Sequence, residues 1–247
     1  MAPVSQTTGA HAVEQNLGRL AEAHDRLMAT ATVLSDEQCG EPSLLPGWSR
    51  GHVLTHIARN ADGLRNLLIW AHTGVATQQY GSLEERDAQI EAGSGRTAGE
   101  LAADLASSAH AFMEQARELT DEAWNAEVKA MRGPAHPAWF TLHRRLTEVE
   151  VHHVDLAAGY GPQDWAEWFV TDMLYQVTGR IAEQDDAPAV TVTDTSSGRQ
   201  YLLGHDARSD RDITGPGPEL LAWLLGRSKG DGLVADPQGP LPDVPPF

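Results

Sequence analysis

The sequence contains a single cysteine, Cys39, among its 247 residues, which excludes a disulfide within the chain and any metal site built on several thiolates. Metal ligands would therefore have to be histidine, aspartate or glutamate. Cys39 lies among the acidic residues Asp36, Glu37 and Glu41, whereas a reactive thiolate needs nearby positive charge or a helix N-terminus to lower its pKa. We expect Cys39 to have no catalytic role.

Positive charge is also scarce. The chain has 18 lysine and arginine residues against 35 aspartate and glutamate residues, a formal net charge of -17. Nucleic-acid binding depends on clustered cations that neutralise phosphates, so this charge balance argues against a nucleic-acid-binding protein and against attachment to an anionic membrane surface.

Long apolar runs are absent as well. None approaches the roughly 20 residues that cross a bilayer, and residues 1–16 lack a basic segment followed by an apolar one. We therefore expect a cytoplasmic monomer whose partners are small molecules rather than nucleic acid or membrane. With 41% hydrophobic residues and seven tryptophans, the chain can nevertheless form a substantial core.

The first part of the chain has the apolar periodicity of α-helices. Apolar residues recur at helical spacing in four long segments, at about residues 11–34, 49–73, 97–119 and 138–158. Four helices of this length predict a bundle, with Ser49 as the N-cap of the second. The stretch between the second and third helices is too polar and glycine-rich for a core helix and predicts a long, functional loop.

After residue 160 the pattern changes. A helix at about 164–183 precedes two β-rich runs, residues 187–195 and 199–204, whose short separation predicts a hairpin. A further helix is expected to begin near Pro218. We therefore predict an α+β protein with two domains, a four-helix bundle at 1–160 and a smaller α+β domain at 161–247.

Histidines and a glutamate stand at helical spacing in two of the predicted helices. His52 and His56 are four residues apart, so both rings can reach one point, or one of them only packs. Glu148 and His152 have the same spacing, and with a histidine from another helix they would form the two-histidine, one-carboxylate set of a catalytic zinc site. Spacing alone favours the alternative, an ordinary helix-surface pair worth a few tenths of a kcal/mol.

Several common catalytic motifs are missing. The sequence has no H-E-x-x-H, which weakens a metalloprotease interpretation. At strand-to-helix turns it also has no G-x-S-x-G, P-loop or G-x-G-x-x-G, so serine hydrolase, NTPase and Rossmann interpretations lack their motifs in the required place.

Four stretches carry a family likeness: LLPGWSRGHVLTHIARNADGL, WAHTGVATQQYGSLEERDAQIEAGS, EVEVHHVDL and LLAWLLGRSKGDG. Together they resemble the mycothiol-dependent maleylpyruvate isomerases, a branch of the DinB-like superfamily of metal-dependent thiol enzymes. The resemblance runs from about residue 10 to 235. The helix motifs are typical of the whole superfamily, whereas the second stretch and the C-terminal Gly-Arg are more specific to the isomerases.

The resemblance implies the fold and the metal ligands. It implies a DinB-like four-helix bundle that holds a divalent metal, usually zinc, followed by an α+β domain similar to sterol-carrier folds. Carried over to this sequence, the ligands are His52, Glu148 and His152, and His56 is only a neighbour of the site.

The resemblance also implies further site residues. Arg227 in the C-terminal domain is the implied catalytic residue, so that both domains contribute to one site; otherwise it is a helix C-terminal cation. Apart from the resemblance, Tyr80 and Arg86 in the polar loop between the second and third helices are further candidates for contacts to the substrate or the thiol, with a solvated loop as the alternative for both.

The implied activity is the cis-trans isomerisation of maleylpyruvate to fumarylpyruvate in the gentisate route of aromatic catabolism. Mycothiol would supply the nucleophile, and zinc would bind its sulfur and lower the pKa of the thiol. Thiolate addition to the alkene, bond rotation and loss of thiolate would follow, with Arg227 holding a carboxylate or the enolate.

Two alternatives remain at this point, a mycothiol S-transferase acting on another electrophile and a non-catalytic metal-binding regulator such as an anti-sigma factor. Because the substrate is a dianion and the net charge of the chain is -17, an isomerase also needs cations concentrated at its site.

Overall fold

The computed structural model describes residues 9–185, 187–204 and 211–244, and the chain divides into two compact units, Met1–Tyr160 and Gly161–Phe247. The first unit is mostly helical, and the second combines helices with a four-stranded sheet. The predicted α+β class is therefore confirmed. No helix in the described ranges is both long and apolar enough to cross a membrane.

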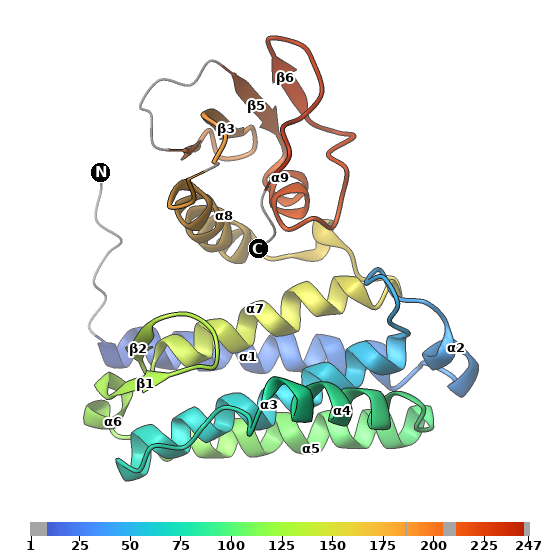
Figure 1. Cartoon of the computed structure of the whole chain (residues 1–247), viewed down its shortest axis with the longest axis vertical. Helices are drawn as coiled ribbons and strands as arrows, with labels where there is room; N and C mark the ends of the chain where they lie inside the picture. Colours follow the sequence, from blue (N-terminus) through green and yellow to red (C-terminus); the bar gives the residue numbers. More distant parts are fainter. Residues whose placement is uncertain (1–8, 186, 205–210, 245–247) are drawn as a thin grey trace. The chain divides into compact units, whose positions relative to one another are not determined.

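Four long helices form a bundle in the first unit, as the periodicity predicted. They are α1 (Gly9–Ala31), α3 (Arg50–Thr73), α5 (Ala98–Arg117) and α7 (Phe140–Asp155). Helices α1 and α3 each pack against both α5 and α7 (Figure 1). The apolar stripes of all four helices meet in the core, which includes Leu20, Leu27, Leu54, Ile57, Leu64, Leu101, Leu105, Leu142, Leu146 and Val149.

Both ends of α3 have the caps that its sequence favours. Ser49 is the N-cap, as predicted, and its Oγ accepts a hydrogen bond from the backbone N–H of His52 at 3.3 Å. Gly74 ends the helix with a φ of 71°, a left-handed conformation that glycine adopts without steric cost.

The stretch predicted as a loop contains a helix, α4 (Leu83–Ser94), and this prediction was wrong. Ser82 caps the helix by accepting a hydrogen bond from the backbone N–H of Glu85 at 3.0 Å. Only Ile90 and Gly93 of α4 are buried, so the helix lacks the apolar stripe by which sequence analysis recognises one.

Helix α4 packs closely on α3, and two glycines make this approach possible. A Cβ atom on Gly93 would lie 2.5 Å from Cγ2 of Thr55, and one on Gly51 would lie 2.1 Å from the carbonyl oxygen of Ser94. Because α4 is held directly against α3, its polar side chains face residues of the α3 surface.

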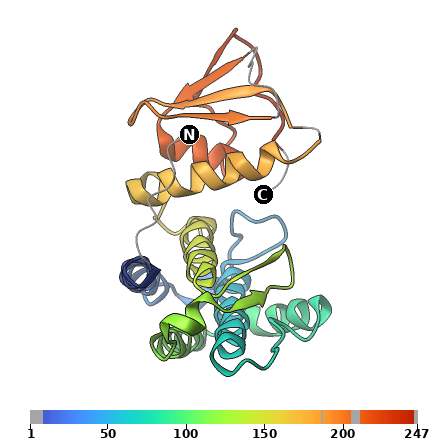
Figure 2. The same cartoon turned by 90° about the vertical axis from the view of Figure 1, so that its left-hand side faces the viewer.

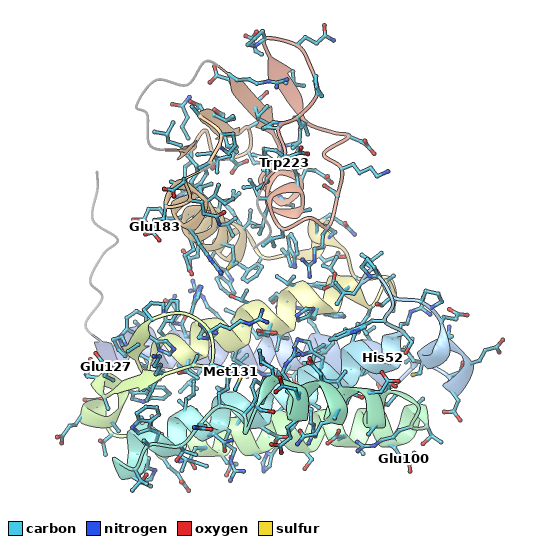
Figure 3. All side chains as sticks on the ribbon, in the orientation of Figure 1. His52, Glu100, Glu127, Met131, Glu183 and Trp223 are labelled. Atoms are coloured by element: carbon cyan, nitrogen blue, oxygen red, sulfur yellow. The ribbon has the colours of Figure 1, made fainter. Side chains whose placement is uncertain are left out.

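Smaller elements, which the sequence did not predict, join the bundle helices. They are α2 (Asp36–Gly40), α6 (Asp121–Asn125) and the antiparallel hairpin of β1 (Glu127–Lys129) and β2 (Ala135–Pro137). The turn of this hairpin is tied to the chain before α4, because the Met131 backbone N–H donates to Oε1 of Gln79 at 2.9 Å. Figure 3 labels Met131.

The second unit has two helices on one face of its sheet (Figure 2). The strand order is β4-β3-β5-β6, with β3 antiparallel to β4, as predicted for the hairpin, and parallel to β5. A short 3-10 helix precedes them, and the bounds are η1 (Pro162–Asp164), α8 (Glu167–Ala182), β3 (Val190–Asp194), β4 (Gln200–Leu203), β5 (Asp212–Gly215), α9 (Gly217–Leu224) and β6 (Val234–Asp236).

Candidate metal and substrate site

Helices α3 and α7 bring two histidines and one glutamate together. Nε2 of His56 lies 3.1 Å from Oε2 of Glu148, and Nε2 of His152 lies 3.3 Å from the same oxygen. The potential ligand atoms of these three residues all lie within 4.8 Å of one another. Many catalytic zinc sites have two imidazoles and one carboxylate as their protein donors, and these sites keep a further coordination position open.

The protonation of two of these groups suits metal binding. Burial, with the nearby charges of His152 and Arg86, lowers the pKa of His56 to about 4, so its imidazole is neutral. Burial alone would raise the pKa of the Glu148 carboxyl, but hydrogen bonds and charge from His152 and His56 hold it well below its ordinary value. Neutral imidazole and ionised carboxylate are the ligating forms of these side chains.

The orientation of His152 is set by a buried carboxylate. Its Nδ1 lies 2.8 Å from Oδ2 of Asp155, whose side chain is fully buried. Burial lowers the pKa of His152, but its hydrogen bonds to Asp155 and Glu148 outweigh this and raise the pKa overall. Histidines that bind metal commonly donate their second N–H to such a carboxylate, which directs the other nitrogen at the ion. The donor set therefore fits a divalent metal.

Of the three ligands that the resemblance implies, the structure places Glu148 and His152 in this cluster together with His56, and it places His52 elsewhere. His52 lies one turn earlier in α3 (Figure 3), where its Nδ1 accepts a hydrogen bond from the backbone N–H of Ser49 at 3.2 Å. Its Nε2 lies 3.2 Å from Oε2 of Glu91 on α4. Both ring nitrogens of His52 are thus engaged at the start of the helix, and the described residues do not place it in the cluster with Glu148.

The structure brings Arg86 and Tyr80 to the same cluster. Arg86 extends from α4, and its Nη2 donates to Nδ1 of His56 at 2.9 Å. Its guanidinium carbon lies 5.9 Å from the centre of the Tyr80 ring. Burial, and then the charge of Glu148, raise the pKa of Tyr80, so the phenol keeps its proton at neutral pH. The alternative of a solvated loop does not describe either residue.

A pocket opens beside the cluster, and its charge differs from that of the whole chain. Its wall includes His56 and Glu148 of the cluster together with Arg86, Arg132 and Arg144. Glu148 is the one carboxylate among the described residues that line this pocket, and three arginines line it as well. One of them, Arg86, also pairs with Asp87, which is not part of the lining, at 2.6 Å. Because the net charge of the chain is -17, a site for an anionic substrate would need cations close to it. The arginines of this pocket are such cations.

Comparison with known proteins relates this site to a family. The sequence profile described as the mycothiol maleylpyruvate isomerase N-terminal domain matches residues 20–157, more than half of the chain, and includes all three residues of the cluster. The chain belongs to this family. No curated protein sequence matches the chain significantly.

Two solved structures resemble this mycothiol maleylpyruvate isomerase family member over nearly its whole length. One is a crystal structure of the mycothiol-dependent maleylpyruvate isomerase, with a TM-score of 0.89 and 28% sequence identity over 95% of this chain and 97% of that chain. The other is a mutant of that isomerase with one histidine replaced by alanine, with a TM-score of 0.88 and the same identity and coverage. The fold of the chain is therefore that of a mycothiol-dependent isomerase.

Arg227, the residue of the second unit that the resemblance implied as catalytic, lies just beyond α9. The helix ends at Leu224, and Gly226 follows with a φ of 71°. The half-buried Arg227 donates from Nη1 to the carbonyl oxygen of Leu225 at 2.7 Å. This contact is the one expected of a cation at a helix C-terminus, and a catalytic role for Arg227 stays a prediction.

If this protein, like the isomerase it resembles, uses an external thiol, its own cysteine is not the nucleophile. Replacing Cys39 with alanine should then leave kcat within about twofold of the wild-type value. Cys39 is only 2% exposed, and burial together with the charge of Asp36 raises the pKa of its thiol, so little thiolate forms at neutral pH. Steady-state kinetics at saturating thiol, with thermal unfolding as the stability control, would measure this. A large loss of kcat at unchanged stability would make Cys39 the nucleophile instead.

Proposed function

We propose that the protein catalyses the cis-trans isomerisation of maleylpyruvate to fumarylpyruvate, with zinc as its metal and mycothiol as a thiol co-substrate. The convergence of His56, Glu148 and His152 beside an arginine-lined pocket carries this proposal. The site offers a metal-binding donor set and cations for an anionic substrate, and the chain belongs to a family named for this activity.

The nucleophile in this proposal comes from outside the chain. Rotation about a carbon–carbon double bond needs that bond to become single for a time, which reversible addition of a thiolate achieves. The lone cysteine is buried and has a raised pKa, so mycothiol supplies the sulfur. A zinc ion held by His56, Glu148 and His152 supplies, when bound, the positive charge that lowers the pKa of a thiol toward neutrality.

The proposed reaction leaves the composition of both reactants unchanged. A carbon–sulfur bond forms at one alkene carbon, and the π electrons move through the conjugated system to the carbonyl oxygen as an enolate. The former double bond rotates as a single bond. The enolate electrons then restore the double bond and expel the thiolate, which returns mycothiol and releases the trans product.

Arg86 is suited to hold an anionic group during this reaction. It now donates to Nδ1 of His56, whose Nε2 faces Glu148. A histidine that ligates through Nε2 keeps its proton on Nδ1, so His56 in that form becomes a donor on this side. Nη1 of Arg86 already donates to Asp87 at 2.6 Å, but Nη2 then needs another acceptor. A carboxylate of the substrate or the thiol is such an acceptor. Tyr80, protonated and beside Arg86, adds a neutral donor.

An assay of maleylpyruvate with and without mycothiol tests the proposal. We expect the ultraviolet absorbance of maleylpyruvate to change only when protein and mycothiol are both present, with fumarylpyruvate as the product. Mycothiol should be recovered unchanged after many turnovers, because addition is reversed. Consumption of one mycothiol for each substrate would instead indicate an S-transferase, and loss of substrate at the same rate without any thiol would contradict the proposed mechanism.

A further inference from the structure

Two arginines in the pocket lie on elements that meet beside the cluster. Arg144 is on α7, four residues before Glu148 and therefore on nearly the same face of the helix. Arg132 is on the turn between β1 and β2, and both arginines line the pocket that contains His56 and Glu148. Helix α7 and the hairpin thus place two cations in the lining of that pocket.

The turn that carries Arg132 is held in place. The Met131 backbone N–H donates to Oε1 of the buried Gln79 at 2.9 Å, directly before Arg132 in the chain. Arg144 reaches the same turn, because its Nη1 lies 4.0 Å from the position that a Cβ on Gly133 would occupy. The guanidinium group of Arg144 therefore lies beside the turn that carries Arg132.

Carboxylates are scarce in the lining of this pocket. The exposed Arg132 forms no ion pair with any residue of the described ranges, and Glu148, which is hydrogen-bonded to both histidines of the cluster, is the only described carboxylate in the pocket wall. Guanidinium groups bind carboxylates through paired, charge-assisted hydrogen bonds, so this arrangement suits an acid as its ligand.

We infer that Arg132 and Arg144 form a carboxylate-binding subsite that selects a dianionic cis-alkene substrate. Arg86 donates to His56 of the candidate metal cluster, so it suits groups near the reacting bond, which leaves Arg132 and Arg144 for the second carboxylate. This inference rests on the proposed function for the identity of the substrate, but the subsite itself requires only that a dicarboxylate binds there.

Isothermal titration of the zinc-loaded full-length protein with maleate, a cis-dicarboxylate that lacks the ketone, tests the subsite without any turnover. We expect Arg132→Ala and Arg144→Ala each to raise the Kd of maleate about tenfold or more, the loss typical of a charged hydrogen-bonding partner. Arg132→Lys and Arg144→Lys should restore affinity only partly, because lysine lacks the two-pronged donor geometry. Dimethyl maleate, which is uncharged, should not bind measurably to the wild type or to any of these variants.

Arg96→Ala is the matched control, since Arg96 pairs with Asp104 away from the pocket wall and its loss should leave the Kd of maleate unchanged. Zinc content and thermal unfolding must match the wild type in every variant that is compared. Unchanged maleate affinity in both alanine variants, or no maleate binding by the wild type at millimolar concentration, would overturn the subsite. If maleate binding depends on both arginines but maleylpyruvate is not isomerised, the subsite stands and the proposed reaction does not.

Discussion

Replacing His56 with alanine should remove most of the divalent metal from the purified protein, which we expect to carry about one ion per chain. Two donors cannot replace the convergent set of three, and Nε2 of His56 is 3.1 Å from Oε2 of Glu148. The metal affinity should fall by more than about 100-fold, beyond the loss typical of residues that only orient ligands, and isomerase activity should fall with it. Elemental analysis and competition with a chromophoric chelator would measure both affinity and content.

His52→Ala is the matched control, because the two histidines are one helical turn apart. Removing the His52 side chain removes half of the capping box at Ser49, which should cost about 1 kcal/mol of folding stability. The metal content should stay near one ion per chain. If His52→Ala lost the metal and His56→Ala kept it, the ligand set implied by the resemblance would be right and the cluster of His56, Glu148 and His152 would not be the metal site. Loss of metal in both variants at matched folding would mean that His52 also holds the ion.

Replacing Arg227 with alanine should lower kcat/KM by about 100-fold or more, the effect of losing a donor that stabilises charge in the transition state. Metal content should stay normal, since Arg227 is outside the described cluster of potential ligands. Thermal stability should change by less than about 1 kcal/mol, the size of a helix-terminal charge effect, because Nη1 of Arg227 donates to the carbonyl of Leu225 at the end of α9.

Two further variants separate catalysis from a structural role of Arg227. Arg227→Lys should recover little activity, because lysine keeps the charge but not the planar, two-pronged donor geometry. Lys229→Ala removes a neighbouring exposed cation and should leave kcat/KM within about twofold of the wild type. A lower melting temperature with unchanged kcat/KM in Arg227→Ala would leave the arginine as a helix-terminal cation only.

The sequence was sufficient for those elements whose burial follows a simple period. The four bundle helices, the Ser49 cap and the β3–β4 hairpin are all present, because an apolar stripe or a short turn between β-rich runs is local information. Helix α4 was missed because almost none of it is buried. What holds α4 is its contact with α3 across Gly51 and Gly93, and a sequence pattern does not show which surfaces approach that closely.

Residue types and spacing determined that Glu148 and His152 share a helix face and that any metal would have to be bound through histidine and carboxylate. The tertiary structure decided which histidine of α3 lies beside this pair. One signal was available in the sequence: with Ser49 as the N-cap, His52 stands at the third helical position, where a polar side chain can turn back to the cap. That signal shows how His52 can be engaged but does not show that His56 faces α7.

Only the packing of α3 on α7 places His56 opposite Glu148, and only the packing of α4 and the β1–β2 turn places Arg86 and Arg132 in the same pocket. Period and spacing describe the direction of a side chain relative to its own helix. Where two helix faces meet depends on many core contacts and close approaches between segments far apart in the chain. These contacts decided that His56, and not His52 one turn earlier on the same helix, joins the candidate site.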